Sequence, residues 1–220
     1  LHSLPTDFPR PAVPTYNGAV QQLELDCQQA KRLQQVASAQ QCSSFNLYHS
    51  VIAALIARLS NERRVVTAVA LANREQAGLD QMIGFFVNTL VVVHDVDLSH
   101  SFVTQMQQCQ RQLSQLLSHS ISFEQLVELI NPLRSLSHHP LFQLMFVLHN
   151  NQQVEADLPQ LDITAQRSRA ALAKFDLTLI GTETDSGLQF NWEYNTDLFA
   201  GQSIVRFNSC FIHLLHSIIE

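Results

Sequence analysis

The stretch "IGFFVNTLVVV" (Ile83–Val93) decides the fold. A strand that is covered on both faces of a sheet is normally a near-continuous apolar run, so this composition predicts a buried β-strand over Ile83–Val93. Two polar residues, Asn88 and Thr89, nevertheless stand in its middle. A buried amide or hydroxyl group costs about 1–3 kcal/mol unless it finds a hydrogen-bond partner. We therefore expect these two side chains to serve a specific purpose.

Apolar residues on both sides of this strand follow the periods of further helices and strands. Helical spacing is predicted for residues 23–42, and further helices are expected within residues 43–61, 97–120, 122–130 and 197–220. Strands are predicted within residues 63–72 and 140–150, and a hairpin within residues 174–195. Gly187 supplies the positive φ of the hairpin turn. Helices that alternate with strands early, followed by an antiparallel hairpin, favour a layered α/β fold with a mixed sheet.

Helix boundaries follow from short polar residues beside the apolar runs. Ser43 or Ser44 is placed to cap the helix within residues 43–61, and Ser99 or Ser101 to cap the one within residues 97–120. The helix within residues 122–130 is halted by Asn131-Pro132.

Two segments have no helical or strand period. The first, "LPTDFPRPAVP" (residues 4–14), holds four of the seven prolines and is predicted to be a connecting segment, because proline restricts its own φ and that of its predecessor. The second covers residues 151–173. A loop of that length inside a compact domain is usually functional.

Composition excludes several classes of function. The net charge is −6 and no run of Lys or Arg occurs, so neither nucleic acid nor an anionic membrane is an expected partner. No apolar segment approaches the roughly 20 residues of a membrane helix, and the first residues lack the pattern of a signal peptide. The chain begins with Leu, so we expect it to be part of something longer.

The four cysteines, Cys27, Cys42, Cys109 and Cys210, are scattered, and no pair has the spacing of a metal or redox site. We predict reduced structural thiols in a cytoplasmic protein and no metal site. His138-His139 cannot share one helical face as ligands at i and i+4 do, so this pair is interpreted as part of a polar loop before a strand.

Catalytic motifs based on local spacing are missing from the sequence. The patterns G-x-S-x-G, G-x-G-x-x-G and G-x-x-x-x-G-K-[ST] do not occur, so nucleophile-elbow and phosphate-loop chemistry has no support. Glu183 and Asp185 lie in the hairpin and are expected to be solvated. Trp192, on an alternating strand, is predicted to belong to the core. From the residues alone, the chain is an α/β domain without a complete catalytic set.

Several segments, in their order along the chain, resemble motifs of condensation domains of nonribosomal peptide synthetases. "IGFFVNTL" is similar to (I/V)-G-x-F-V-N-T, "RSLSHHPLFQLMF" to R-D-x-S-R-N-P-L and its following strand, and "SISFEQLVELINP" to the segment that contains Q-D-x-P-F-E. "DFPRP" resembles the linker between the two halves of these domains, "LANRE" their A-x-R segment, and "AKFDLTL" and "EYNTDLF" later elements. Together these marks span almost all of residues 6–220.

The resemblance implies a chloramphenicol-acetyltransferase-like fold, in which a mixed β-sheet is covered by helices in two layers. Condensation domains are V-shaped pairs of such halves, and this chain looks like the C-terminal half. Residues 1–15 would be the linker between the halves and residues 16–220 the C-terminal subdomain, with a crossing latch at about residues 149–166. The partners implied are the N-terminal half, the upstream and downstream peptidyl carrier proteins and the adjacent adenylation domain.

The family reaction is amide formation between a carrier-bound acyl or peptidyl thioester and a carrier-bound aminoacyl amine. No cofactor is expected to bind directly, because the substrates arrive on the 4'-phosphopantetheine of the carrier proteins. The histidine motif H-H-x-x-x-D-G belongs to the other half, so no catalytic residue is expected in this chain. His138-His139 does not replace it, because Gln143 stands at the aspartate position.

The resemblance also suggests individual residues. Candidates for the substrate tunnel are Arg74, Asn88, Thr89, Ser137 and His139, with Asn88 and Arg74 first. Residues expected to have structural roles in the motifs are Gly84, Phe86, Phe123, Glu124, Arg134 and Pro140. A purely structural role stays open for the tunnel candidates as well: Asn88 would then satisfy backbone groups and Arg74 would pair with a carboxylate.

The sequence departs from the family motifs at five positions. Ser120 and Ser122 replace Asp and Pro, Ser135 replaces Asp, His138 replaces Arg and His139 replaces Asn. His139 is expected to titrate near neutral pH, where the family has an amide. These departures leave open a degenerate, non-catalytic module that docks carrier or tailoring proteins. A separate alternative is a different acyltransferase of the same superfamily, such as an epimerization, heterocyclization or coenzyme-A-dependent relative, although "VNTL" favours an ordinary condensation domain over epimerization relatives.

Overall fold

The structure is a computed structural model of the whole chain. It describes residues 4–72, 78–79, 82–119, 121–133, 135–149, 172–184 and 186–220. The strands are β1 (Gly18–Asp26), β2 (Arg64–Leu71), β3 (Asn88–Asp95), β4 (Leu144–His149), β5 (Leu177–Thr184) and β6 (Gly187–Asn195). The helices are α1 (Cys27–Ala39), α2 (Ser44–Ser60), α3 (Phe102–Ser118), α4 (Phe123–Ile130) and α5 (Gly201–Ile219).

The strands form one six-stranded sheet in the order β1-β6-β5-β4-β2-β3. β4 pairs in parallel with both β2 and β5, whereas the β1–β6, β5–β6 and β2–β3 pairs are antiparallel. The predicted mixed sheet is therefore confirmed. The β5–β6 hairpin is also confirmed, with Gly187 at a φ of 139°.

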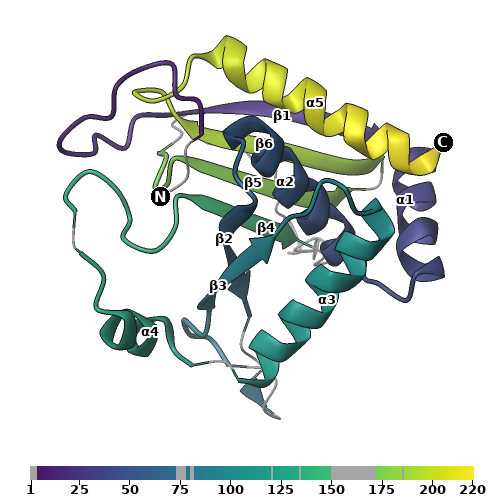
Figure 1. Cartoon of the computed structure of the whole chain (residues 1–220), viewed down its shortest axis with the longest axis horizontal. Helices are drawn as coiled ribbons and strands as arrows, with labels where there is room; N and C mark the ends of the chain where they lie inside the picture. The colour runs from purple at the N-terminus through teal and green to yellow at the C-terminus, as the bar shows by residue number, and fades with distance from the viewer. Residues whose placement is uncertain are drawn as a thin grey trace, which may run out of the picture.

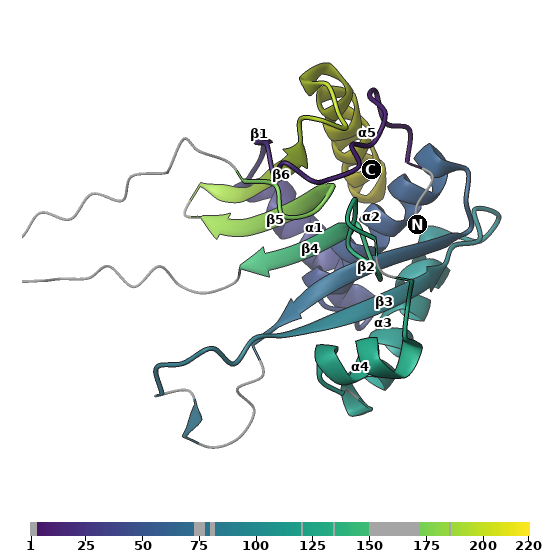
Figure 2. The ribbon, with the colours of Figure 1, turned by 90° about the vertical axis from the view of Figure 1, so that its left-hand side faces the viewer.

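The helices α2, α3 and α5 pack on one face of this sheet, and α1 lies beside the end of α5 (Figure 1). Seen from the side, the sheet and these helices form two layers, and α4 stands apart near the start of β3 (Figure 2). Large side chains from the sheet and from the helices fill the core between the two layers, among them Ile52, Phe146, Phe190, Trp192 and Phe211. Trp192 belongs to this core as predicted, and its indole N–H donates to Asn208.

The prediction of a continuous helical segment over residues 23–42 is wrong in its first part. Leu23 and Leu25 belong to β1, where they pair with Phe190 and Leu188 of β6. The helical period begins only after Asp26, whose carboxylate accepts a hydrogen bond from the backbone N–H of Gln29 and closes a capping box. Two apolar residues at i and i+2 fit a strand equally well, and the pairing with β6 decides between the two structures.

The predicted strand over Ile83–Val93 is also wrong in its first half. β3 begins at Asn88, opposite the last residue of β2, Leu71. Residues 83–87 lie outside this strand, and two of their side chains, Ile83 and Phe85, are almost fully exposed.

The remaining helices begin close to where the sequence places them. Ser43 and Ser101 are the N-caps of α2 and α3, and the hydroxyl of each accepts a hydrogen bond from a backbone N–H. Ser122 caps α4 with a capping box, and Asn131 ends it in a left-handed conformation. α5 begins at Gly201, a few residues after the start of the predicted segment. Within the part of the chain that is described, no helix combines the length and apolarity needed to cross a membrane.

Candidate functional site

A cavity of about 300 Å³ lies where the N-terminal segment, the loop before β4 and the segment before β5 meet. It is lined by Pro14, Tyr16, Ser135, Leu136, Ser137, His138, His139, Gln143, Ala173, Lys174, Phe175, Asp176 and Asn195. Two of the predicted tunnel residues, Ser137 and His139, are among them. Ser137 and His139 are close in the sequence, and the structure adds the residues from distant segments that line the cavity with them.

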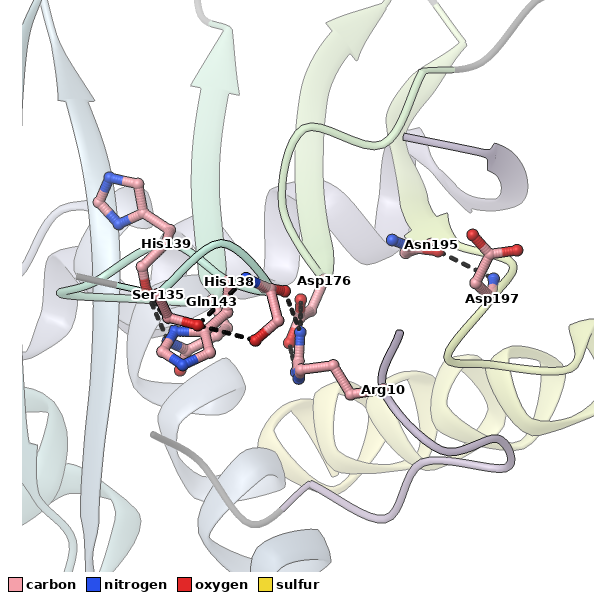
Figure 3. A network of polar contacts seen from close by, with 9 residues as sticks. Arg10, Ser135, His138, His139, Gln143, Asp176, Asn195 and Asp197 are labelled. Atoms are coloured by element: carbon pink, nitrogen blue, oxygen red, sulfur yellow. Dashed lines mark hydrogen bonds and ion pairs between the residues drawn. The ribbon is translucent and has the colours of Figure 1, made fainter. Parts of the chain in front are cut away.

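An ion pair between Arg10 and Asp176 fixes one side of the cavity (Figure 3). One guanidinium nitrogen donates to Asp176 Oδ1 at 2.9 Å, and the second donates to Oδ2. The first nitrogen also lies 3.4 Å from the carbonyl oxygen of Ser137. The carboxylate raises the pKa of Arg10, mainly through the hydrogen bonds, against the opposing effect of burial. Such a two-point contact fixes direction as well as distance, so it holds the N-terminal segment against the segment before β5.

The loop before β4 is held by its own polar groups. The hydroxyls of Ser135 and Ser137 lie 2.8 Å apart, and Ser135 also accepts from the backbone N–H of Ser137. The side chain of Gln143 donates to the carbonyl oxygen of His139 at 3.0 Å. The predicted polar loop over His138-His139 is confirmed, and its ordered contacts allow it to present His139 in one position.

The imidazole of His139 lies in an aromatic cage. Its ring centroid is 4.0 Å from that of Phe142, 5.5 Å from Phe123 and 5.8 Å from Phe175. Burial among these rings lowers the pKa of His139, and the neighbouring His138 adds a smaller effect in the same direction. Burial therefore favours the neutral imidazole and shifts the titration of His139 to lower pH.

The tautomer of His139 follows from its hydrogen bonds. Nδ1 accepts from the backbone N–H groups of Leu141 and Phe142, each at 3.4 Å. A neutral imidazole that accepts at Nδ1 carries its proton on Nε2. His139 thus presents a neutral N–H donor, which suits the positioning of a carbonyl or amide group and not the abstraction of a proton.

Asn88 joins two elements outside the cavity. Its side-chain N–H donates to the carbonyl oxygen of Ile121 at 3.1 Å, and its Oδ1 accepts from the backbone N–H of Phe123 at 3.2 Å. The amide thus ties the start of β3 to the first turn of α4. Phe123 then reaches the ring of His139, so Asn88 is connected to the cavity through α4. These contacts give Asn88 the backbone-satisfying role that the sequence analysis left open.

The other predicted residues are distributed more widely. Thr89 is half-buried in β3 opposite Ala70, Glu124 is exposed in the first turn of α4, and Pro140 directly follows His139. Gly84 precedes β3, where an added Cβ would meet the ring of Phe86 at 2.9 Å. Arg74, Arg134 and almost all of the predicted latch lie outside the described residues.

Arg10, Lys174 and Asp176 were not among the residues predicted for the site. All three lie in segments that resemble family motifs, "DFPRP" and "AKFDLTL", so the resemblance points to these segments but not to these residues. Their role could not be read from the sequence because Arg10 and Asp176 are 166 positions apart. The charge complementarity of one Arg and one Asp among many is too weak a signal to pair them.

The whole chain, residues 1–220, matches the sequence profile of the family described as Condensation domain. Malpinin synthetase of Mortierella alpina is 37% identical over 209 residues, which is 94% of this chain and 3% of that protein. The dimodular nonribosomal peptide synthase of Bacillus subtilis (strain 168) is 35% identical, over 89% of this chain and 8% of that protein. The chain thus spans only a small part of the curated relatives that it matches.

Solved structures show the same fold. The holo form of a four-domain nonribosomal peptide synthetase bound to AMP and glycine superposes with a TM-score of 0.87 at 29% identity, over 100% of this chain and 18% of that one. The X-domain from teicoplanin biosynthesis superposes with a TM-score of 0.90 at 23% identity, over 99% of this chain and 50% of that one. With a profile match along its entire length, this chain belongs to the condensation-domain family.

Proposed function

We propose that this chain is the C-terminal half of a nonribosomal peptide synthetase condensation domain, a domain that forms amide bonds between carrier-bound substrates. The observation that carries the proposal is a contrast of lengths. The chain matches the family along all 220 residues, yet it covers only 50% of the solved X-domain and 51% of a solved epimerization domain. One half of a two-part domain accounts for both figures.

Exposed apolar side chains support the proposal that another part of the domain packs against this chain. Ile83, Phe85 and Leu133 have relative exposures of 104%, 91% and 95%, and Leu136 and Leu129 have 80% and 76%. They come from the segment before β3, the end of α4 and the loop before β4 (Figure 2). Large exposed apolar patches usually mark an interaction surface. In this proposal the N-terminal half covers them.

The cavity beside Arg10 and Asp176 would then form part of one wall of the substrate tunnel. The ion pair holds the wall in shape, Lys174 places a cation at its lining, and His139 offers its neutral N–H to an amide of an incoming pantetheine arm. The chain's contribution to the rate is mainly positioning, since two tethered substrates held in register react as if within one molecule. The histidine motif for proton transfer is assigned to the N-terminal half.

The decisive experiment is an amide-bond assay with both carrier proteins loaded. The 220-residue chain alone is expected to give no product, and the chain joined to its upstream half is expected to give the dipeptidyl thioester, measured by mass spectrometry. The observation behind this expectation is the absence of an H-H-x-x-x-D-G motif from the sequence. Product from the isolated chain would overturn the division of roles.

A second assay concerns Asn88 within the intact domain. Its amide fixes α4, and through Phe123 the position of His139, so Asn88→Ala is expected to slow condensation more than its loss of Tm alone explains. Ser186→Ala, on the exposed β5–β6 turn, is the control for a general effect of substitution. A loss of rate that tracks the loss of folded protein would give Asn88 a structural role only.

A non-catalytic docking module is the second candidate. The replacements at Ser135, His138 and His139 favour it. The X-domain that was solved as a complex with OxyB from teicoplanin biosynthesis has the same fold, with a TM-score of 0.89. That likeness, at 23% identity, concerns the fold alone. Sequencing about 200 residues of coding message upstream separates the two, given domain halves of that size. An intact histidine motif supports the enzyme, and a broken one supports the docking module.

A further inference from the structure

Away from the cavity, three side chains that are common metal ligands converge in the core. His49 comes from α2, His94 from β3 and Cys109 from α3, and all three are buried. Each offers one ligand atom, and these atoms lie within 4.8 Å of one another. Nothing in the proposed condensation chemistry uses them. We propose that His49, His94 and Cys109 form a binding site for Zn²⁺ that fastens α2 and α3 to the edge strand β3.

The distance between the two imidazoles fits this assignment. Nε2 of His49 lies 3.2 Å from Nε2 of His94. Two nitrogens on one tetrahedral Zn²⁺, each about 2.0–2.1 Å from the metal, are about 3.3 Å apart. The two rings stand nearly perpendicular at 87° in an edge-to-face contact, with centroids 4.5 Å apart.

The sulfur is close but has to move. Sγ of Cys109 lies 3.9 Å from Nδ1 of His49, whereas His94 faces Nε2 of that ring. One ion binds only one nitrogen of an imidazole, so the sulfur has to swing toward the Nε2 side. A zinc-bound sulfur and nitrogen are about 3.6 Å apart, so the ligand set, at most 4.8 Å across, contracts by about 1 Å on binding. Rotation about the first side-chain bond of Cys109 is the motion with the smallest consequences for the surrounding core.

Binding a metal fixes the protonation of all three side chains. Each imidazole binds the ion in its neutral form, and coordination breaks the hydrogen bond between the two Nε2 atoms. Zn²⁺ replaces the thiol proton, which leaves to solvent, and the ion compensates the charge of the buried thiolate.

Space for a fourth ligand lies beside the three side chains. A small cavity of about 20 Å³, enough for one water, is lined by Ser50, His94, Asp95, Cys109 and other residues of α3. It provides the fourth position of a tetrahedral ion. The Thr67 hydroxyl, 2.7 Å from Nε2 of His49 and 3.4 Å from Nε2 of His94, closes the opposite side and occupies the imidazoles when no ion is bound.

Metal content after controlled loading tests the site. The full chain, without an affinity tag, is incubated with Zn²⁺, passed through a desalting column and analysed by atomic spectroscopy, with about one ion per chain expected. Loading with Co²⁺ is expected to give the sulfur-to-metal charge-transfer absorption of a thiolate ligand. Cys109→Ala is expected to lose that absorption and to weaken binding by about 100-fold or more, since even an outer-shell partner is worth 10–100-fold.

Matched controls separate this site from the surface. Cys210→Ser and His213→Gln alter an exposed thiol and an exposed imidazole of α5, and both are expected to bind as the unaltered chain does. Cys109→Ser replaces the alanine variant in this test if the circular dichroism spectrum shows that the alanine variant does not fold. Retention of no ion by the unaltered chain would leave a hydrogen-bonded cluster only. Equal retention by the folded Cys109 variants would assign the ion to surface histidines. Either result overturns the proposal without touching the condensation assay.

Discussion

Arg10 in the N-terminal segment and Asp176 before β5 form a two-point ion pair across 166 positions of the chain. The pair also reaches the loop before β4, because the same guanidinium contacts the carbonyl oxygen of Ser137. A proline-rich segment without helix or strand is thereby made part of the cavity wall. The side chains of Arg10 and Asp176 are 26% and 12% exposed, so the contact is only partly screened by water.

Asp176→Asn is expected to lower the free energy of unfolding by about 2 kcal/mol, since a partly buried guanidinium loses its charged partner. Chemical denaturation measures the change. The control is Asp97→Asn, which removes the carboxylate that Arg63 contacts at 2.9 Å on the surface and is expected to cost less, because water screens that pair. Equal losses would mean that the Arg10–Asp176 pair is as well solvated as the surface one.

Asn88→Ala is expected to loosen α4 more than the rest of the fold. The substitution leaves the Phe123 N–H and the Ile121 carbonyl without their partner, at a cost of about 1–3 kcal/mol where water cannot replace it. Hydrogen exchange should show faster exchange at Phe123 and the following turn, with β5 and β6 unchanged. Thr89→Val is the neighbouring control. Uniform acceleration across the sheet would contradict a local role for Asn88.

Acid is expected to destabilise the chain through its buried histidines. The pKa of His94 is lowered to about 4 and that of His49 lies well below 6.5, so the unfolded state takes up protons that the folded state refuses. Their contribution is complete above about pH 6.5 and is lost as the pH falls toward 4, by up to about 3 kcal/mol for His94. Urea midpoints measured between pH 7.5 and 4.5 with a chelator present should therefore fall.

His94→Gln should flatten that slope, whereas His213→Gln, at an exposed position, should leave it unchanged. His139, whose pKa is also lowered by burial, contributes in the same direction and accounts for part of the slope that remains. A slope that His94→Gln does not alter would show that His94 takes up its proton as readily in the folded protein as in the unfolded one.

Gly187→Ala is expected to be among the most damaging single substitutions. The backbone φ of 139° is one that residues with a Cβ rarely adopt, and the added atom would lie 2.1 Å from the carbonyl oxygen of Leu25. The register of both the β5–β6 hairpin and the β1–β6 pair is fixed here, so we expect a loss of more than about 2 kcal/mol, measured by thermal unfolding. Ser186→Ala, one residue earlier on the turn, should be nearly neutral.

Local periodicity predicted an element correctly where the segment also carries residues that mark its ends. α2 begins after Ser43 and α4 after Ser122, and the β5–β6 hairpin turns at Gly187, because caps and positive-φ glycines act within a few residues. It failed at Leu23–Leu25 and at Ile83–Val87, where apolar residues fit more than one structure. There the presence of β6, and the end of β2 at Leu71, decided the outcome.

The sequence by itself determined the family, the mixed α/β class and the segments from which the candidate site is built, because these depend on residues that are close neighbours in the chain. Only the tertiary structure decided that Arg10 faces Asp176, that Asn88 holds α4, and that His49, His94 and Cys109 meet in one place. Contacts between distant positions depend on how the sheet orders its strands and stacks its helices. Such contacts leave no pattern along a single sequence, because each polar residue has many possible partners elsewhere in the chain.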